Sequence, residues 1–335
     1  MPASSPHDLN TLSLPALFNH FASTGLIQRI IELAADEDLG PAQDDDARTE
    51  SRFKWQAGSG DITTDASIDP SARATAHLIA RKPGIIAGLA TIPLLLETFT
   101  TDVKVETLSQ DGTIVEKSTL LAKLEGPLDE LLSLERTMLN LIGRLSGVAT
   151  NTRRHVDTLA NIKTKSRLYD TRKTTPGLRV LEKYAVRCGG GFSHRIGLYD
   201  AVLLKDNHLA GIPITDLANW VSASAKRARA HSTKPEDVKF IECEVDSLDQ
   251  LQALFKVPKG DLDIVLLDNM NTSQLAQAVA LRDKHAPHLE LEASGGVTLE
   301  TLPEIAKTNV DRISVGALTH SAVQLDVALD VVDVH

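Results

Sequence analysis

Charged, hydroxyl and glycine residues directly follow six short apolar segments in the second half of the chain. In order they are Asp170-Thr171-Arg172-Lys173, Lys205, Glu244, Asp268, Ser294-Gly295-Gly296 and Gly316. Arginine recognises carboxylates and phosphates through a planar fork, and lysine supplies a mobile positive charge. Glycine turns that precede a helix expose backbone N–H groups to phosphate. This set of residues predicts an active site for anionic substrates.

The apolar segments that carry these residues have the length and composition of buried parallel strands. They cover residues 166–169, 201–204, 239–243, 264–267, 289–293 and 313–315, with helix-length stretches between them. Strands that alternate with helices form parallel sheets, and ligands bind at the carboxyl ends of those strands. Six strands are too few for an eight-stranded barrel. We therefore expect an incomplete six-stranded parallel α/β barrel, with an open sheet as the alternative.

The first half of the chain has a different pattern, which predicts a small antiparallel sheet with helices. Strand-like segments lie between residues 74 and 124, and a helical stretch begins at Pro127. A break near Gly143-Gly147 separates it from a second helix over 148–160. We place an α/β sandwich domain at 1–149, with a polar loop over 41–59, and the barrel domain at 150–318. An amphipathic C-terminal segment, 319–335, is expected to return to the first domain.

Composition excludes several classes of protein. The net charge of −10 argues against a nucleic-acid partner, because phosphate backbones require a basic surface. The two cysteines, Cys188 and Cys243, have no paired spacing, which favours a reducing compartment over a disulfide framework or a zinc site. No segment reaches the roughly 18 apolar residues of a membrane span. We expect a cytoplasmic protein with neither membrane nor nucleic acid as a partner.

Individual motifs leave alternatives open. Lys205 ends an apolar strand, where a lysine can form a Schiff base, but the nearby cations favour anion binding. Glu244 and Asp268 end successive strands and suit three tasks, namely holding ribose hydroxyls, ligating Mg²⁺ through oxygen and stabilising an oxocarbenium ion. Glu242 stands two residues before Glu244, and one of the two is expected to face elsewhere.

Glycines mark two further parts of the site. Gly189-Gly190-Gly191 follows a predicted helix, unlike a dinucleotide fingerprint, and lets the backbone approach a ligand near His194 and Arg195. Ser294-Gly295-Gly296 lies between a strand and a helix, and Gly316 ends the next strand. Together these two loops match the phosphate site that the last strand-end loops of a barrel form.

With these motifs assembled, the chain resembles the quinolinate phosphoribosyltransferase family from about Leu26 to Leu329. The specific stretches are DTRKTTPGLRVLEKY at 170–184, His194-Arg195, KDNH at 205–208, LLDN at 266–269, EASGGV at 292–297 and VGALTHS at 315–321. In the first half, GDITT at 60–64 and LNLIGRLSGVAT at 139–150 also look like that family.

The resemblance implies an α/β sandwich, an incomplete barrel of six parallel strands, and an activity in NAD synthesis. The enzyme would form nicotinate mononucleotide, pyrophosphate and CO₂ from quinolinate and phosphoribosyl pyrophosphate, with Mg²⁺. It would be a homodimer, or a larger assembly of such dimers. Residues 41–59 would be an insertion relative to the family, and Ser193 stands where asparagine is more usual.

The resemblance also implies roles for particular residues. The quinolinate carboxylates would be bound by Arg172, His194, Arg195 and Lys205, with Arg144 contributed by the partner subunit. Thr171 would be part of the same substrate-binding motif, and Lys173 would approach the pyrophosphate. Glu244 and Asp268 would address the ribose and its metal, partly through water. The 5′-phosphate would be held by Ser294, Gly295, Gly296 and Gly316.

Three other readings lead to different experiments. A relative that uses another carboxylated heterocycle without decarboxylation is separated by comparing quinolinate with nicotinate as the acceptor. A Schiff-base aldolase predicts borohydride trapping at Lys205. A regulatory anion-binding module that has lost catalysis predicts the loss of Glu244, Asp268 or Ser294, and all three are present.

Overall fold

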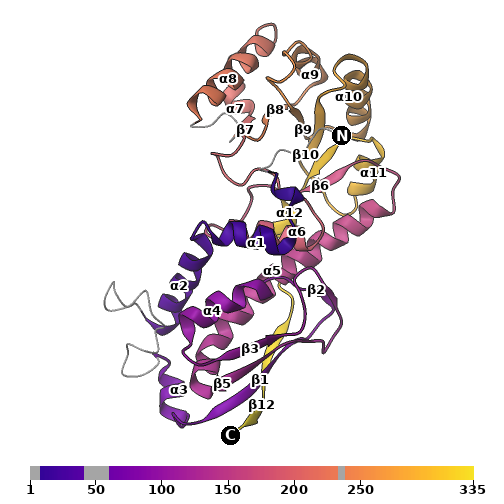
Figure 1. Cartoon of the computed structure of the whole chain (residues 1–335). Coiled ribbons are helices and arrows are strands. Elements are labelled where there is room, and N and C mark those ends of the chain that lie inside the picture. The colour runs from indigo at the N-terminus through magenta and orange to yellow at the C-terminus, as the bar shows by residue number, and fades with distance from the viewer. Residues whose placement is uncertain (1–7, 41–59, 233–237) are drawn as a thin grey trace. The chain divides into compact units, whose positions relative to one another are not determined.

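The computed structural model describes residues 8–40, 60–232 and 238–335, and the chain forms two compact units (Figure 1). The first unit contains residues 8–12, Arg154–Thr174 and Gly191–His320, and the second contains Ser13–Arg153, Thr175–Gly190 and Ser321–His335. The loop over 41–59 lies outside the described residues.

The first unit is built on a six-stranded parallel sheet in the order β6-β11-β10-β9-β8-β7. Its strands are β6 (Arg167–Tyr169), β7 (Val202–Leu204), β8 (Ile241–Val245), β9 (Ile264–Asp268), β10 (Glu290–Ser294) and β11 (Arg312–Ser314). The first strand in the chain, β6, pairs with the last, β11, as in a barrel. However, β6 and β7 do not pair and form the two edges of the sheet. The sheet is therefore an incomplete barrel that is open between β6 and β7, which confirms the predicted fold class.

Helices connect the strands of this sheet and bury its apolar residues. They are α7 (Asp206–Leu209), α8 (Leu217–His231), α9 (Leu248–Leu254), α10 (Thr272–His285), α11 (Leu302–Lys307) and α12 (Ala317–His320). Ser247 caps α9, because its hydroxyl accepts the Gln250 N–H at 3.4 Å. Asn271 caps α10 and Thr301 precedes α11.

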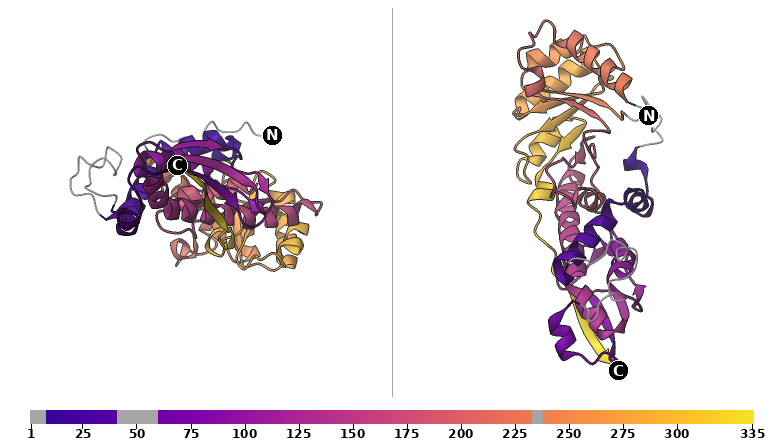
Figure 2. Two further views of the ribbon diagram at one scale, coloured as in Figure 1. Left: turned by 90° about the horizontal axis from the view of Figure 1, so that it is seen from below. Right: turned by 90° about the vertical axis from the view of Figure 1, so that its left-hand side faces the viewer.

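The second unit contains a four-stranded antiparallel sheet in the order β12-β1-β5-β3. These strands are β1 (Arg73–Ala80), β3 (Lys104–Thr107), β5 (Leu120–Pro127) and β12 (Val327–Val334). Alternate residues of β1 are buried, as expected for a strand with one face on a core. The C-terminal strand β12 pairs antiparallel with β1 and is the yellow strand of this sheet in Figure 2.

Helices and short strands complete the second unit. They are α1 (Leu14–Ala22), α2 (Leu26–Leu39), α3 (Ile62–Ser67), β2 (Gly84–Ile85), α4 (Ile92–Phe99), β4 (Ile114–Val115), α5 (Leu128–Ala160) and α6 (Arg179–Cys188). Segment 175–190, which contains α6, belongs to this unit, whereas the sequence-based division at residue 149 places it in the barrel domain. None of the helices in the described residues is both long and apolar enough to cross a bilayer.

The predicted break in α5 at Gly143-Gly147 is wrong, because α5 continues through both glycines. The glycines serve a close packing contact instead. A Cβ at Gly143 would lie 3.0 Å from the Leu325 carbonyl oxygen, and one at Gly147 would collide with the Val323 carbonyl. The Leu325 N–H donates to the Gly143 carbonyl at 2.9 Å. The absence of side chains on α5 thus allows the chain before β12 to lie against the helix backbone.

Candidate active site

The strand register of the first unit brings the predicted site residues to one edge of the sheet. Ser294 on β10 lies opposite Asp268 on β9, and Leu204 on β7 lies opposite Cys243 on β8. Lys205 follows Leu204 and Glu244 follows Cys243, so Lys205 and Glu244 lie side by side near the carboxyl ends of β7 and β8. Parallel strands end at a common edge, and the site that was predicted from separate strand ends is therefore one region of the first unit.

Lys205 and Glu244 form the most direct contact between two predicted site residues. The Lys205 Nζ lies 2.6 Å from the Glu244 Oε2. The Glu244 side chain is 11% exposed and that of Lys205 is 46% exposed. The pair therefore presents a mobile cation toward solvent above a mostly buried carboxylate.

Asp268 is held by the residue that follows it. The Asn269 side chain donates from Nδ2 to Asp268 Oδ2 at 2.8 Å, and the Asn269 N–H donates to the Ser294 carbonyl at 2.9 Å. Asn269 has a φ of 52°, a left-handed conformation that asparagine tolerates better than most residues. A Cβ on Gly295 would collide with the Asn269 side chain. Asn269 thus joins Asp268 to the glycine turn.

The loop after β6 lies against the loop after β11. The Thr171 hydroxyl accepts the Lys173 N–H at 3.0 Å, and the Thr319 hydroxyl donates to the Lys173 carbonyl at 2.7 Å. A Cβ on Gly316 would lie 2.8 Å from the Lys173 Cδ and 3.3 Å from the His320 Nε2. The Lys173 and His320 side chains therefore both lie close to the backbone of Gly316.

Two guanidinium groups of the first unit, those of Arg172 and Arg195, lie close enough for one charge to affect the other. Burial, and then repulsion from the Arg172 charge, lower the pKa of Arg195. Arg195 is 7% exposed and donates from Nη1 to the Ala201 carbonyl at 3.3 Å. Within the described residues, the buried Nε of Arg172 has no hydrogen-bond acceptor. Neighbouring cations with an unsatisfied donor are suited to an anion with more than one negative charge.

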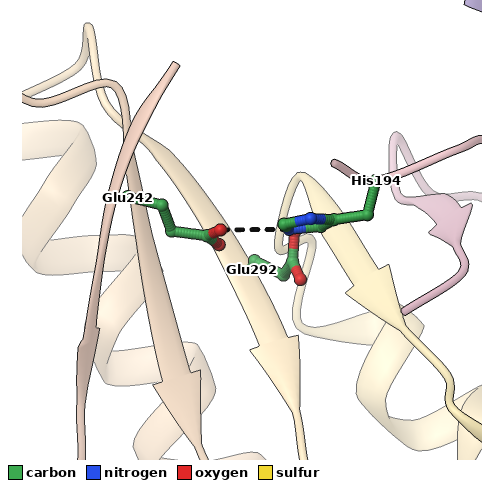
Figure 3. Close-up of side chains that lie close together, drawn as sticks. All are labelled: His194, Glu242 and Glu292. Atoms are coloured by element: carbon green, nitrogen blue, oxygen red, sulfur yellow. Dashed lines mark ion pairs between the residues drawn. The ribbon is translucent and has the colours of Figure 1, made fainter. Parts of the chain in front are cut away.

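His194, which directly precedes Arg195, belongs to a buried charged cluster (Figure 3). Its Nε2 lies 3.0 Å from Glu242 Oε2 on β8 and 3.5 Å from Glu292 Oε2 on β10. Arg312 on β11 donates from Nε to Glu292 Oε2 at 2.7 Å. The expectation that Glu242 and Glu244 face different ways is wrong, because residues two apart on a strand project from the same face of the sheet. The two carboxylates differ in their partners instead, since Glu242 contacts His194 and Glu244 contacts Lys205.

The charges of this cluster shift one another's pKa values. Burial lowers the pKa of His194, but the Glu292 and Glu242 carboxylates outweigh burial and raise it to about 9. Burial raises the pKa of Glu292, but His194 and then Arg312 outweigh burial and lower it to about 2. Burial and the Glu292 charge raise the pKa of Glu242. The His194 Nδ1 accepts the Arg195 N–H at 2.8 Å, a contact that favours the neutral ring and opposes the rise.

Arg144 belongs to the second unit, whereas the other predicted site residues all belong to the first. It donates from Nε and Nη2 to Glu182 Oε1 at 3.1 and 2.6 Å, and from Nη1 to the Ala322 carbonyl at 3.0 Å. Glu182 is fully buried and also accepts the Thr175 N–H and hydroxyl. The guanidinium is thus fixed within the chain, and its role across a dimer interface stays a prediction.

Fold and site together describe an α/β-barrel enzyme for anionic substrates, and comparisons with known proteins specify its family. Residues 61–146 match the quinolinate phosphoribosyltransferase N-terminal domain, and residues 148–330 match the C-terminal domain of the same family. The chain belongs to the quinolinate phosphoribosyltransferase family.

Individual relatives agree over most of the chain. The carboxylating nicotinate-nucleotide pyrophosphorylase of Mycobacterium leprae is 42% identical over 273 residues, which are 81% of this chain and 90% of that protein. A probable enzyme of the same name from Bacillus subtilis is 39% identical, over 83% of this chain and 90% of that protein. The solved nicotinate-nucleotide pyrophosphorylase of Francisella tularensis is 32% identical with a TM-score of 0.77, covering 97% of this chain and 99% of that chain.

Sequence reasoning missed several residues that shape the site. Asn269 is part of the LLDN motif, but only its positive φ reveals its contact with Gly295. Glu292 stands in the middle of β10 between two apolar residues, and Arg312 begins β11; charged residues at such buried positions signal a pair. That signal was present in the sequence.

Proposed function

We propose that the chain transfers the phosphoribosyl group of phosphoribosyl pyrophosphate to quinolinate and releases pyrophosphate and CO₂. The observation that carries this proposal is the pair of neighbouring cations Arg172 and Arg195, with a buried unsatisfied donor on Arg172. Quinolinate has two carboxylates on adjacent ring carbons, so it offers two negative charges to such a pair. Family membership supports the same reaction.

The remaining residues divide between the two substrates in this proposal. Lys205 completes the quinolinate side, with Thr171 in the same motif. Both ring nitrogens of His194 are engaged within the chain, by Glu242 and by the Arg195 N–H, so His194 supports Arg195 instead of contacting quinolinate. Lys173 lies over Gly316 and approaches the pyrophosphate. The turn of Ser294, Gly295 and Gly296 holds the 5′-phosphate through backbone N–H groups, as open glycine turns do in many phosphate sites.

The chemistry requires orientation and charge compensation more than proton transfer. The pyridine nitrogen attacks the anomeric carbon of the ribose while the bond to the pyrophosphate oxygen breaks. Positive charge develops on the ribose, and the carboxylates of Glu244 and Asp268 have the sign to stabilise it. Once the nitrogen is cationic, the bond to the adjacent carboxylate breaks, CO₂ leaves and the ring carbon takes up a proton. Arg172 and Arg195 hold the ring in the attacking orientation.

Magnesium is part of the proposal as the companion of the pyrophosphate. Glu244 and Asp268 offer carboxylate oxygens, which are the donors that Mg²⁺ prefers, so the donor set fits the ion. Asp268 is partly exposed, whereas Glu244 is already neutralised by Lys205. When bound, Mg²⁺ supplies charge compensation for the leaving pyrophosphate. A homodimer in which Arg144 serves the partner's site, and a cytoplasmic location, belong to the same proposal.

A direct assay tests this function. The purified chain is incubated with quinolinate, phosphoribosyl pyrophosphate and Mg²⁺, and nicotinate mononucleotide and CO₂ are measured together. Equal amounts of both products are expected, and nicotinate in place of quinolinate should give little product. Turnover of nicotinate with none of quinolinate would refute the proposal.

A further inference from the structure

The segment that carries His194 and Arg195 has little regular structure of its own. It meets the parallel sheet at an isolated bridge, in which the Phe192 N–H donates to the Leu168 carbonyl and the Asp170 N–H donates to the Phe192 carbonyl. After Phe192, side-chain contacts hold the segment in place of strand pairing. The Asp170 Oδ1 accepts the His194 N–H at 2.8 Å, and the His194 ring enters the buried cluster.

The buried cluster draws on several elements that are far apart in the sequence. Glu242 is on β8, Glu292 on β10 and Arg312 on β11, and all three side chains are almost fully buried. The Arg312 guanidinium lies 3.9 Å from the ring centre of Tyr169 and 5.4 Å from that of Phe240. The His194 ring also contacts both aromatic rings edge to face. The imidazole is therefore enclosed on all these sides by fixed groups.

The charges of this cluster determine whether it can hold a metal ion. His194, Glu242 and Glu292 have the donor types and spacing of a metal site. However, Arg312 already compensates one carboxylate through its 2.7 Å contact with Glu292. A divalent ion beside Arg312 and the two carboxylates would leave an excess positive charge in a buried place, which is costly. The residues of the cluster thus compensate one another's charges without a metal ion.

Stability alone does not explain such a cluster, because apolar side chains of similar volume fill buried space at a lower desolvation cost. What the cluster provides is a defined position for the His194 ring. The Nδ1 of that ring accepts the Arg195 N–H at 2.8 Å, so the ring position sets the backbone from which the Arg195 guanidinium extends.

We propose that Glu242, Glu292 and Arg312 are positioning residues that fix His194, and through it Arg195, for binding of the acceptor. The inference rests on the proposed function, and it adds the prediction that these residues govern quinolinate and not phosphoribosyl pyrophosphate. Glu242 and Glu292 contact His194 directly. The phosphate turns have other partners, since the Asn269 N–H donates to the Ser294 carbonyl and the Thr319 hydroxyl donates to the Gly316 carbonyl.

Variants of the cluster test this proposal against a matched control. Glu292→Gln removes the charge that binds Arg312 and His194 with little change in shape. The control is Asp311→Asn, because Asp311 pairs with the almost fully buried Arg282 at 2.5 Å in the same unit. Arg312→Lys keeps the positive charge without the guanidinium fork and serves if the glutamine variant does not fold.

Two measurements on the full-length chain separate positioning from general destabilisation. The first is hydrogen exchange of the backbone amides over 191–197, and the second is the KM for each substrate. Glu292→Gln should speed exchange in this segment and raise the KM for quinolinate about tenfold, with the KM for phosphoribosyl pyrophosphate changed less than about twofold. Asp311→Asn should lower the melting temperature without either effect.

Two results would overturn the inference. One is exchange over 191–197 that is the same in Glu292→Gln and Asp311→Asn, and the other is an equal rise of both KM values in Glu292→Gln. A wild-type chain that does not use quinolinate would refute the proposed function instead. In that case the exchange comparison still decides whether the cluster holds the segment.

Discussion

The ammonium group of Lys205 lies 2.6 Å from the Glu244 carboxylate, so a cation proposed for the acceptor neutralises a carboxylate proposed for the ribose. The two proposed half-sites are therefore electrostatically linked before either substrate binds. A quinolinate carboxylate that attracts Lys205 would release charge on Glu244, where the oxocarbenium ion needs it.

The first prediction concerns this pair. Lys205→Met should raise the KM for quinolinate by about 10- to 100-fold, because one charge-assisted contact contributes roughly 1.5–3 kcal/mol. Glu244→Gln should mainly lower kcat, since its charge is needed as the ribose becomes cationic. Combining both variants should cost less than the sum of the separate effects. Strict additivity of the two would mean that the pair is not coupled.

Asn269 offers a second prediction, which separates strain from hydrogen bonding. Asn269→Gly removes the contact with Asp268 but suits the φ of 52°, whereas Asn269→Ala adds strain of about 1 kcal/mol. Both should raise the KM for phosphoribosyl pyrophosphate several-fold, and only the alanine variant should clearly lower the melting temperature. If the glycine variant kept the wild-type KM, Asn269 would have no positioning role.

A third prediction compares two glycines with similar backbone conformations. Gly295 has a φ of 94° and faces the Asn269 side chain, whereas Gly211 has a φ of 80° and nothing within 4 Å of an added Cβ. Both Gly295→Ala and Gly211→Ala should lose about 1 kcal/mol of stability through backbone strain. Gly295→Ala should lose more than that, because its Cβ also collides with the Asn269 side chain. Only Gly295→Ala should also weaken phosphoribosyl pyrophosphate binding, as measured by its KM. Equal KM values for the two variants would contradict the assigned phosphate turn.

The pKa of His194 gives a prediction for stability. Its folded-state pKa of about 9 lies above the ordinary value of 6.5, so the stabilisation is complete below pH 6.5 and is lost as the pH rises through 9. The free energy of unfolding should fall by up to about 3 kcal/mol between pH 7 and 10. His194→Gln should show a flatter decline in urea unfolding at the same pH values. Parallel declines would mean that the ring is not protonated in the folded chain.

Much of the fold followed from the sequence because strand ends and polar residues coincide. Each of the six apolar segments became a strand within about two residues of its predicted bounds, and Lys205, Glu244, Asp268 and Ser294 lie at the predicted edge. Parallel strands leave few alternatives, since their carboxyl ends must meet.

Other features depend on contacts that a sequence does not display. Gly143 and Gly147 resemble helix breakers, yet they accommodate the backbone at Val323 and Leu325 within a continuous α5. The pairing of Arg144 with Glu182 and the enclosure of His194 likewise arise from tertiary packing. Propensity arguments describe neighbours in sequence, so they miss these partners.

Arg172 provides the most direct test of the central claim that a pair of cations binds the acceptor. Quinolinate binding is measured by calorimetry for the wild type, for Arg172→Ala and for the control Arg167→Ala. Arg167 lies at the opposite end of the same strand, and its side chain is 53% exposed. We expect Arg172→Ala to weaken binding by at least about 100-fold and Arg167→Ala by less than about twofold. Unchanged quinolinate affinity in Arg172→Ala would contradict the account.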